Sequence, residues 1–430
     1  MSRILITMQN STRKRKMIDL KGICLKAKNA SYRLAFTSSE DKNKMLNAIA
    51  DKILAERQLI KDANAVDIKN AQGVLSNAMI DRLTMTDARI DLMAEGVRQV
   101  AELDDPVGKV VNSWTTPNGL QFRKVRAPLG VIAVIYESRP NVTVDVASLC
   151  IKSGNCVILK GGKEAINSNR ALFNIIQSAL EENGYDKEVV GFVDDVTREA
   201  TYELLQQSQY IDVIIPRGSE TLKKFILTNS QIPVIASSGG NCHVYVEKTA
   251  DLKMAEDILY NAKMQRPSTC NACEQLLVDK DIADKFLPHA LKRLMDDKCV
   301  VLGCKRTKAI VPEVTPAKEE DFKTEKSDYI LTVKVVDNYK QAIDIINANS
   351  THHSEAIISQ DEKIIDTFDK MVDSGCVYTN TSTRFTDGFE FGFGAEIGIS
   401  TQKLHARGPL GLEQLTSEKY LIRGNGQLRK

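Results

Sequence analysis

One cysteine of the chain, Cys270, stands among residues that suit a nucleophile. It lies in the polar segment Gln265–Ala272, where Pro267 precedes it, so a short exposed turn is expected. A thiolate attacks carbonyl carbons, and Arg266 nearby is expected to favour that charged form. Most of the other eight cysteines have apolar neighbours, as Cys156 does, and a buried structural thiol is the ordinary alternative. The sequence therefore predicts covalent chemistry at Cys270.

Cys270 and Cys273 also form a C-x-x-C pair, a spacing found in dithiol redox centres and in zinc sites. Cys299 and Cys304 would have to complete a zinc site, and their spacing fits neither a zinc ribbon nor a zinc finger. The chain has five histidines. We therefore expect no metal centre, and a redox dithiol stays an alternative.

Two glycine turns, at 160–164 and 216–220, lie at the ends of predicted strands and suit a bound anion. A third turn, at 237–241, is expected to bring the backbone close to the cofactor's reactive ring, and a domain hinge is its alternative. Backbone N–H groups at such turns and at helix N-termini bind phosphate. No turn matches G-x-G-x-x-G or a Walker loop, so solvated lysines and an ordinary helix cap are the alternatives. Two strand-to-helix turns in one sheet favour a dinucleotide site. The candidate cofactor-binding residues are Lys160, Gly161, Gly162, Lys163, Arg217, Gly218, Ser219, Gly239 and Gly240.

A polar loop follows the predicted strand Val131–Tyr136 and should lie at the same sheet edge. Arg139 is expected to bind a phosphate or carboxylate together with Glu137 and Ser138. Asn141 is expected to donate to an oxyanion. A plain polar loop is the alternative.

The elements that must position these residues follow from hydrophobic periodicity. Thr37–Glu40 has capping-box form, and helical spacing continues behind it, with breaks, to about Glu102. From Leu129 short β-branched runs alternate with helical stretches, which favours a parallel sheet with helices on both faces. These runs are Val131–Tyr136, Cys156–Lys160, Val189–Val193, Ile211–Ile215 and Pro233–Ala236.

A second alternating region starts after the run His243–Glu247. Its predicted strands are Glu274–Asp279, Ile330–Val336, Glu355–Ser359 and Gly375–Asn380. A cofactor domain followed by a catalytic domain, with the reaction in the cleft between them, is the simplest arrangement. Asn112–Val125 and Thr401–Lys430 are expected to contact another subunit.

Length and composition narrow the class of protein. The 430 residues, 43% hydrophobic, predict at least two soluble domains, and the net charge of +2 demands no acidic partner. The basic run Arg13–Lys16 has no aromatic interleaving, so no nucleic-acid partner is expected. The longest apolar run, Leu129–Tyr136, is too short to span a membrane. Nine cysteines without a regular framework suggest a reducing compartment, the cytoplasm.

With these residues assembled, the chain resembles the gamma-glutamyl phosphate reductases, or glutamate-5-semialdehyde dehydrogenases, of the aldehyde dehydrogenase superfamily. The likeness begins near Met17 and runs to the C-terminus. The stretches that carry it are Val125–Ile132, Tyr136–Asp145, Gln265–Asn271 and Gly394–Pro409.

The resemblance implies an α/β, aldehyde dehydrogenase-like fold in three parts. Residues 17–245 would form a Rossmann-type NADPH-binding domain that includes the N-terminal helices. Residues 246–395 would form an α/β catalytic domain that carries the nucleophile. Residues 112–126 and 401–430 would form a small oligomerisation flap.

The resemblance also implies the reaction, which is NADPH-dependent reduction of L-glutamyl 5-phosphate to glutamate 5-semialdehyde in proline biosynthesis. Cys270 would be the nucleophile, Lys160 would hold the adenosine ribose, and Ser219 would lie at the pyrophosphate. Arg139, Arg266 and Arg407 are candidates for assisting the departure of phosphate. His405 and Arg407 are candidates for binding either the substrate's α-carboxylate or the leaving phosphate. A homo-oligomer and transient contact with glutamate 5-kinase are expected. The alternatives are another acylating aldehyde dehydrogenase, such as a CoA-dependent one, and a non-catalytic redox or binding protein.

One departure from the wider superfamily fits a reductase. Hydrolytic members carry a Glu-Leu-Gly-Gly segment whose glutamate activates water, and the corresponding segment here is Ser237–Gly240, which has no carboxylate. Water attack on a thioester would waste the activated substrate, so the absence of this carboxylate favours reduction over hydrolysis.

Overall fold

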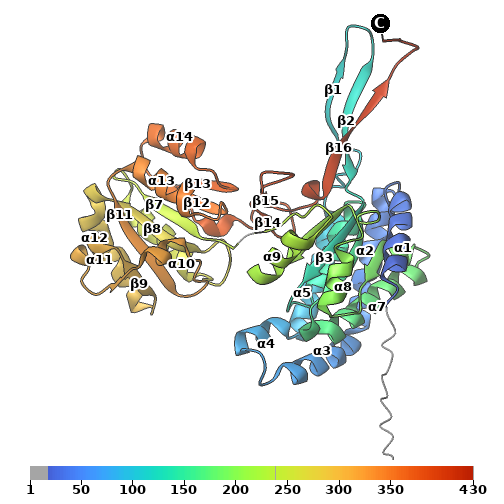
Figure 1. The fold of residues 1–430 in the computed structure, drawn as a ribbon, viewed down its shortest axis with the longest axis horizontal. Helices are drawn as coiled ribbons and strands as arrows, with labels where there is room; N and C mark the ends of the chain where they lie inside the picture. The colour runs from blue at the N-terminus through green and yellow to red at the C-terminus, as the bar shows by residue number, and fades with distance from the viewer. Residues whose placement is uncertain (1–17, 238, 430) are drawn as a thin grey trace, which may run out of the picture.

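The computed structural model describes residues 18–237 and 239–429, which form two α/β units and a projecting arm (Figure 1). The basic run at 13–16 lies outside the described residues. No helix in these two stretches is both long and apolar enough to cross a membrane.

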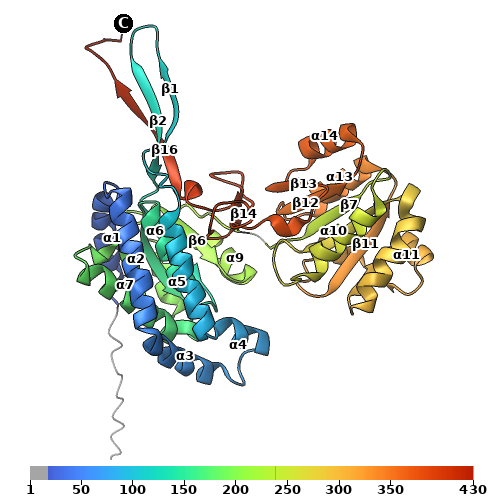
Figure 2. The same ribbon diagram turned by 180° about the vertical axis from the view of Figure 1, so that it is seen from behind.

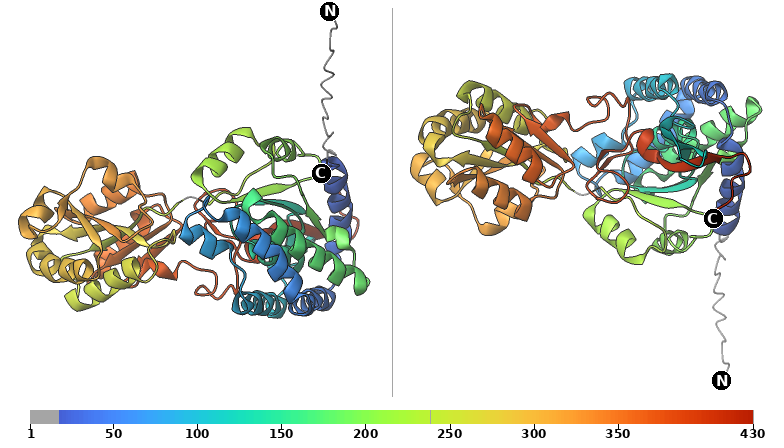
Figure 3. Two further views of the ribbon diagram at one scale, coloured as in Figure 1. Left: turned by 90° about the horizontal axis from the view of Figure 1, so that it is seen from below. Right: turned by 90° about the horizontal axis from the view of Figure 1, so that it is seen from above.

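The first unit is built on a four-stranded parallel sheet in the order β5-β4-β3-β6. Its strands are almost wholly buried, because helices cover both faces, as Figure 3 shows. The strands are β3 (Val131–Tyr136), β4 (Cys156–Gly161), β5 (Val190–Phe192) and β6 (Val213–Arg217). The helices that connect them are α6 (Val142–Lys152), α7 (Ile166–Glu182) and α8 (Arg198–Leu204), and α9 (Glu220–Asn229) follows β6.

Five N-terminal helices pack against this unit, and Figure 2 shows them from behind. They are α1 (Leu20–Leu34), α2 (Ser39–Ala55), α3 (Arg57–Ala71), α4 (Asn77–Leu83) and α5 (Asp87–Glu102). The predicted end near Glu102 is confirmed. The predicted cap is wrong by one residue, because Ser38 caps α2 by accepting the N–H of Asp41 at 3.1 Å.

Buried lysines hold the helices to the sheet unit. Lys152 Nζ, at the end of α6, donates to the carbonyl oxygen of Ala101 at 2.7 Å and to Asn43 Oδ1 at 2.6 Å. Lys42 is fully buried and bonds Asp105 at 2.6 Å. Each ammonium therefore has the partners that burial requires.

The second unit is a seven-stranded parallel sheet in the order β10-β9-β11-β8-β7-β12-β13. Its strands are β7 (Cys242–Val246), β8 (Cys273–Asp279), β9 (Val300–Gly303), β10 (Thr315–Pro316), β11 (Ile330–Val336), β12 (Ser354–Ile358) and β13 (Cys376–Thr379). Its helices are α10 (Leu252–Met264), α11 (Lys280–Asp296), α12 (Lys305–Ile310), α13 (Tyr339–Asn349) and α14 (Glu362–Met371).

The predicted boundary between the two units needs correction. β7 pairs with β8 and β12, so the second sheet begins at Cys242 and residues up to 245 do not all belong to the first unit. The predicted strand Pro233–Ala236 is reduced to a single bridge between Val234 and Ile214. Pro233 has no N–H to donate to a ladder, which explains the short pairing.

The projecting arm joins the two segments that were expected to contact another subunit. β1 (Val110–Thr115) and β16 (Thr416–Arg423) flank β2 (Gln121–Pro128) in an antiparallel sheet. The segment between the second unit and β16 returns to the first unit, where Ile397, Leu410 and Leu415 join its core. It includes the short strands β14 (Ile399–Ser400) and β15 (Gly408–Pro409). Only the last part of residues 401–430 therefore belongs to the arm.

A buried histidine lies directly before β12. His353 is not exposed, its Nδ1 lies 2.8 Å from Ser354 Oγ, and its Nε2 has no hydrogen-bond partner in the described part of the chain. Burial, with a smaller contribution from Lys223, lowers the pKa of His353 to about 4. The native fold thus holds the imidazole neutral.

Acidification should destabilise the fold through His353. Its native pKa lies below the usual value of 6.5, so the stability gained from a neutral ring is full above pH 6.5. That stability is lost as the pH falls toward 4, by at most about 3 kcal/mol. His353→Gln should flatten the fall of Tm between about pH 6.5 and pH 4.5, measured by calorimetry.

The control is His289→Gln, which alters an exposed histidine on α11 and should leave the pH dependence of Tm as it is in the wild type. Parallel Tm curves for the wild type and His353→Gln would contradict the assignment.

Candidate active site

The loops that follow β3 and β6 meet at the carboxyl edge of the first sheet. On one side of β3 lie β4 and β5, and on its other side lies β6. The strand order therefore reverses at β3, and parallel sheets of this kind bind ligands at such a switch point. Ser219 caps α9, and its N–H donates to Glu137 Oε2 at 2.7 Å. A Cβ at Gly218 would lie 2.5 Å from that carboxylate oxygen. The turn therefore already holds an anionic group.

The turn after β4 has the same character. Glu164 lies over Gly162 and accepts the N–H of Ser138 at 2.7 Å. Lys160 is 3% exposed and donates to the carbonyl oxygen of Asp195 at 2.8 Å, and burial lowers the pKa of its ammonium to about 8. Carboxylates occupy both glycine turns, and phosphate shares their charge and acceptor oxygens. These residues fit a nucleotide cofactor.

Cys270 lies on the loop directly before β8, at the amino edge of the second sheet, and is partly exposed. The neighbouring Asn271 ties this loop to the chain near the short 3-10 helix η4 (Thr383–Phe385). Its side chain donates to the carbonyl oxygens of Arg384 and Thr386 at 3.2 and 3.0 Å. Thr383 Oγ1 donates back to the Asn271 carbonyl at 2.7 Å. The thiol therefore sits on a fixed loop, as the sequence predicted.

Gly240 packs directly on the backbone of Cys270. A Cβ at Gly240 would overlap the carbonyl oxygen of Cys270, and the Cys242 thiol donates to that oxygen at 3.1 Å. Gly239 differs, because its Cβ would meet the carboxylate of Glu325 and, at 3.8 Å, that of Glu220, both at the ends of flexible side chains. The predicted turn thus contacts the nucleophile loop itself. Ser238, in the middle of that turn, lies outside the described residues.

The charge state of Cys270 differs from the sequence prediction. Burial raises the pKa of its thiol to about 11, and Arg217 is the main group that opposes this rise. Lys223 opposes it to a smaller extent, while Glu325 and Glu396 add to it. Arg217, which was expected to bind cofactor, therefore favours the thiolate more than the neighbouring Arg266 does.

A cavity of about 690 Å³ lies between the two units and the N-terminal helices. The first unit contributes Arg139, Asn141 and Asp145, and the second contributes Arg266. Arg82 of α4 also lines it. Burial lowers the pKa of Arg139, as do the nearby Arg217, Arg82 and Arg266. With Arg89, four arginines therefore line the cavity.

Five carboxylates line the same cavity, those of Asp81, Glu95, Asp145, Asp387 and Glu396, and burial raises the pKa of Asp145 and of Glu396. Asp145 rises to about 6 and accepts a hydrogen bond from Asn141 Nδ2 at 2.7 Å. Glu396 rises to about 7, and its Oε2 is buried without a hydrogen-bond partner among the described residues. Neither was predicted from the sequence as a site residue.

Three predicted residues are held differently from expectation. One N–H of the Asn141 side chain is donated to Asp145, so only the other remains for an oxyanion. Arg407 pairs with Asp373 at 2.8 Å, and His405 Nε2 contacts the carbonyl oxygen of Gln414. Neither Arg407 nor His405 is among the residues that line the cavity.

The C-x-x-C pair is divided between two environments. Cys273 is fully buried in the core of the second unit, while Cys270 lies on the loop, and both are free thiols. In the described part of the chain, no group of three or more His, Cys, Asp or Glu side chains is arranged to hold a metal ion.

The residues that the sequence did not reveal come from distant segments. Arg82 ends a helix nearly 190 residues before Cys270, and Glu325 precedes β11. No local motif marks them. Glu396 and Asp145 lay within the recognised stretches Gly394–Pro409 and Tyr136–Asp145, so these stretches were the signals available.

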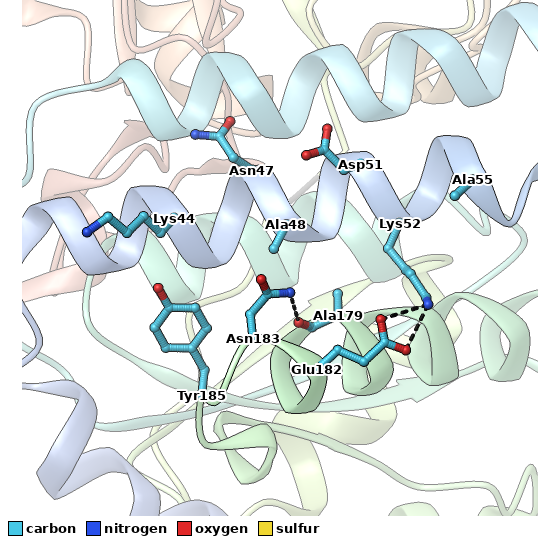
Figure 4. A pocket seen from close by; sticks show the side chains of 10 residues that line it. All are labelled: Lys44, Asn47, Ala48, Asp51, Lys52, Ala55, Ala179, Glu182, Asn183 and Tyr185. Carbon is cyan, nitrogen blue, oxygen red and sulfur yellow. Dashed lines mark hydrogen bonds and ion pairs between the residues drawn. The ribbon is translucent and has the colours of Figure 1, made fainter.

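A second hollow, of about 520 Å³, lies on the outer helices between α2 and α7 (Figure 4). Its charged residues are paired, since Lys52 bonds Glu182 at 2.8 Å. It lies apart from the loops described above and contributes nothing to their chemistry.

Known proteins resemble this chain over nearly its whole length. The aldehyde dehydrogenase family model matches residues 4–310. Gamma-glutamyl phosphate reductase of Petrotoga mobilis is 52% identical over 94% of this chain and 97% of its own. The enzyme of that name from Enterococcus faecalis is 52% identical over 96% of this chain and 100% of its own.

Solved structures agree with this result. The crystal structure of gamma-glutamyl phosphate reductase from Thermotoga maritima superimposes with a TM-score of 0.94, at 42% identity, over 96% of this chain and 100% of that one. An acetylating aldehyde dehydrogenase from Geobacillus thermoglucosidasius shares the fold, with a TM-score of 0.67 at 17% identity. The resemblance and the fold class expected from the sequence are confirmed. The chain belongs to the aldehyde dehydrogenase family and, within it, to the gamma-glutamyl phosphate reductases, which are oxidoreductases.

Proposed function

We propose that the chain reduces L-glutamyl 5-phosphate with NADPH to glutamate 5-semialdehyde and phosphate, through a thioester on Cys270, in proline biosynthesis. The observation that carries this proposal is the fixed, partly exposed thiol of Cys270, which interacts electrostatically with Arg139, one of four arginines that line the cavity. An acyl phosphate is an anionic electrophile, so it needs both a nucleophile and positive charge.

The first step, formation of the thioester, uses only side chains of the protein. The Cys270 thiolate attacks the acyl carbon, a C–S bond forms, and the C–O bond breaks as phosphate leaves with the electron pair. Arg139 and Arg266 line the cavity and would stabilise the leaving phosphate. The second N–H of Asn141 remains a candidate donor to the oxyanion.

The glycine turns of the first sheet would hold the dinucleotide. Lys160 would bind the adenosine ribose, and the N-terminus of α9 at Ser219 would receive the pyrophosphate, with Glu137 moving aside. Lys163 is exposed beside Gly162 and would pair with the 2′-phosphate of NADPH. Bound there, NADPH supplies the hydride that reduces the thioester to the aldehyde.

The other functions considered have weaker support. A CoA-dependent acylating activity shares the fold, but a propionaldehyde dehydrogenase of Rhodopseudomonas palustris with bound CoA and an engineered glycolyl-CoA reductase are only 17% and 18% identical to this chain. A non-catalytic redox or binding role would need no cavity of this charge beside Cys270.

We also propose a cytoplasmic homo-oligomer assembled through the arm. Trp114, Tyr420 and Ile422 are 39%, 55% and 55% exposed there, and apolar side chains gathered on a projecting sheet are typical of subunit contacts. Transient contact with glutamate 5-kinase, which makes the labile substrate, remains part of the proposal.

Cys270→Ala should abolish phosphate-dependent reduction of NADP⁺ by glutamate 5-semialdehyde, the reverse reaction. Loss of a covalent nucleophile should lower kcat by roughly 10³-fold or more. Cys304→Ala, which removes another partly exposed thiol, should keep most of the activity. Substantial turnover by Cys270→Ala would sink the nucleophile assignment.

Alkylation of Cys270 should rise steeply with pH in the enzyme without added dinucleotide. Because the pKa is about 11, the thiolate fraction should grow about tenfold per pH unit between about pH 7 and 10. Arg217→Gln should slow iodoacetamide labelling of the Cys270 peptide at about pH 8 by roughly tenfold, since it removes the main opposing cation. A labelling plateau below about pH 9 would contradict this electrostatic account.

Gly240→Ala should disturb the reacting thiol far more than Gly239→Ala does. The new methyl group at 240 meets the Cys270 backbone, which must shift, whereas at 239 it meets a flexible carboxylate. A displacement of about 1 Å costs on the order of 10²-fold in rate. The measurements are kcat and Tm of both variants, and equal losses would rule out the close contact as the cause.

A further inference from the structure

The cavity beside Cys270 combines charges of both signs. Arg82, Arg139 and Arg266 line it, and none has an acid partner among residues 18–237 and 239–429. A ligand that carried only negative charge would bind best to a cavity lined by cations alone. Asp81, Glu95, Asp145, Asp387 and Glu396 line the same cavity, however, and they would repel such a ligand. Asp81 pairs with Arg89 at 2.9 Å and Glu95 is exposed, whereas burial acts on Asp145 and Glu396.

Asp145 is held in place for a role inside the cavity. It lies in the first turn of α6, and Asn141 donates to its Oδ2 at 2.7 Å. Its other oxygen has no hydrogen bond in the described chain. Asn141 therefore orients the carboxylate without neutralising it.

Glu396 reaches the cavity from the segment that returns after the second unit. The backbone N–H of Gly388 donates a hydrogen bond to the Glu396 carboxylate. The Oε2 atom of Glu396 is buried without a hydrogen-bond partner among the described residues. A buried carboxylate oxygen without a donor is costly unless a ligand supplies one. Burial raises the pKa of both acids, and a bound cation would lower both again.

We infer that Asp145 and Glu396 receive the α-ammonium group of the substrate, so that the site selects free amino-acid derivatives over N-acylated or des-amino analogues. This inference rests on the proposed function. An ammonium offers three donors and one positive charge, which two carboxylates can share. An N-acylated analogue keeps one uncharged N–H and adds bulk where the acids stand.

The test compares two aldehydes in the phosphate-dependent reduction of NADP⁺. Glutamate 5-semialdehyde carries the amine, and 5-oxopentanoate lacks it. Wild type should prefer the amine-bearing aldehyde by roughly 100-fold in kcat/KM, and Asp145→Asn should reduce that preference by about 30-fold or more, mainly through KM. Glu396→Gln should act in the same direction, and KM for phosphate should change little in either variant.

Glu102→Gln removes an exposed carboxylate outside the cavity and should leave the preference unchanged. Equal losses on both aldehydes, or an unchanged ratio, would overturn the inference, because a merely structural role moves both substrates together. Absence of any phosphate-dependent turnover by the wild type would instead overturn the proposed function.

Discussion

Repulsion among the cavity arginines is the constraint around which the site is arranged. A guanidinium keeps its proton in a protein, so Arg82, Arg139 and Arg266 cannot relieve one another by deprotonation. The lowered pKa of Arg139 reflects this repulsion together with burial. An anion bound between them offsets the repulsion. The free energy of unfolding is therefore higher with the anion bound than without it. Such a site is organised before its ligand arrives.

The two sheets position the site residues that must come together around the cavity. The carboxyl edge of the first sheet carries Arg139 and Ser219, and the amino edge of the second carries Cys270. Most strand residues of both sheets are buried, and the site residues Arg139, Ser219 and Cys270 lie on loops at the sheet edges. Gly240, in the segment that joins the two units, packs against the carbonyl oxygen of Cys270. This contact fixes the thiol loop relative to that segment.

The sequence predicted what local pattern controls. The runs at Val131–Tyr136 and Ile330–Val336 became strands with those bounds, because β-branched runs between turns leave few other choices. The loop of Cys270 was also predicted. The cap at Ser38 is a local feature, because its Oγ accepts the N–H of Asp41, and neighbouring hydroxyl residues at 37, 38 and 39 made the choice between them ambiguous. The other missed features depend on contacts between distant segments: the membership of β7, the role of Arg217 beside the thiol, and the places of Arg82 and Asp145 in one cavity. Long-range packing decides these, and no local spacing encodes it.

Selectivity in such a cavity follows from what is left unpaired when a ligand lacks a group. A ligand that lacks an anionic group leaves the arginines without a counter-charge. A ligand that lacks a cationic group leaves the buried carboxylates of Asp145 and Glu396 without one. Each unpaired buried charge costs more than a matched hydrogen bond gains. A site that binds polar groups of the substrate therefore rejects analogues that lack them far more strongly than an apolar pocket rejects a missing methylene. Mixed charge around Cys270 is thus a means of discrimination as well as of binding.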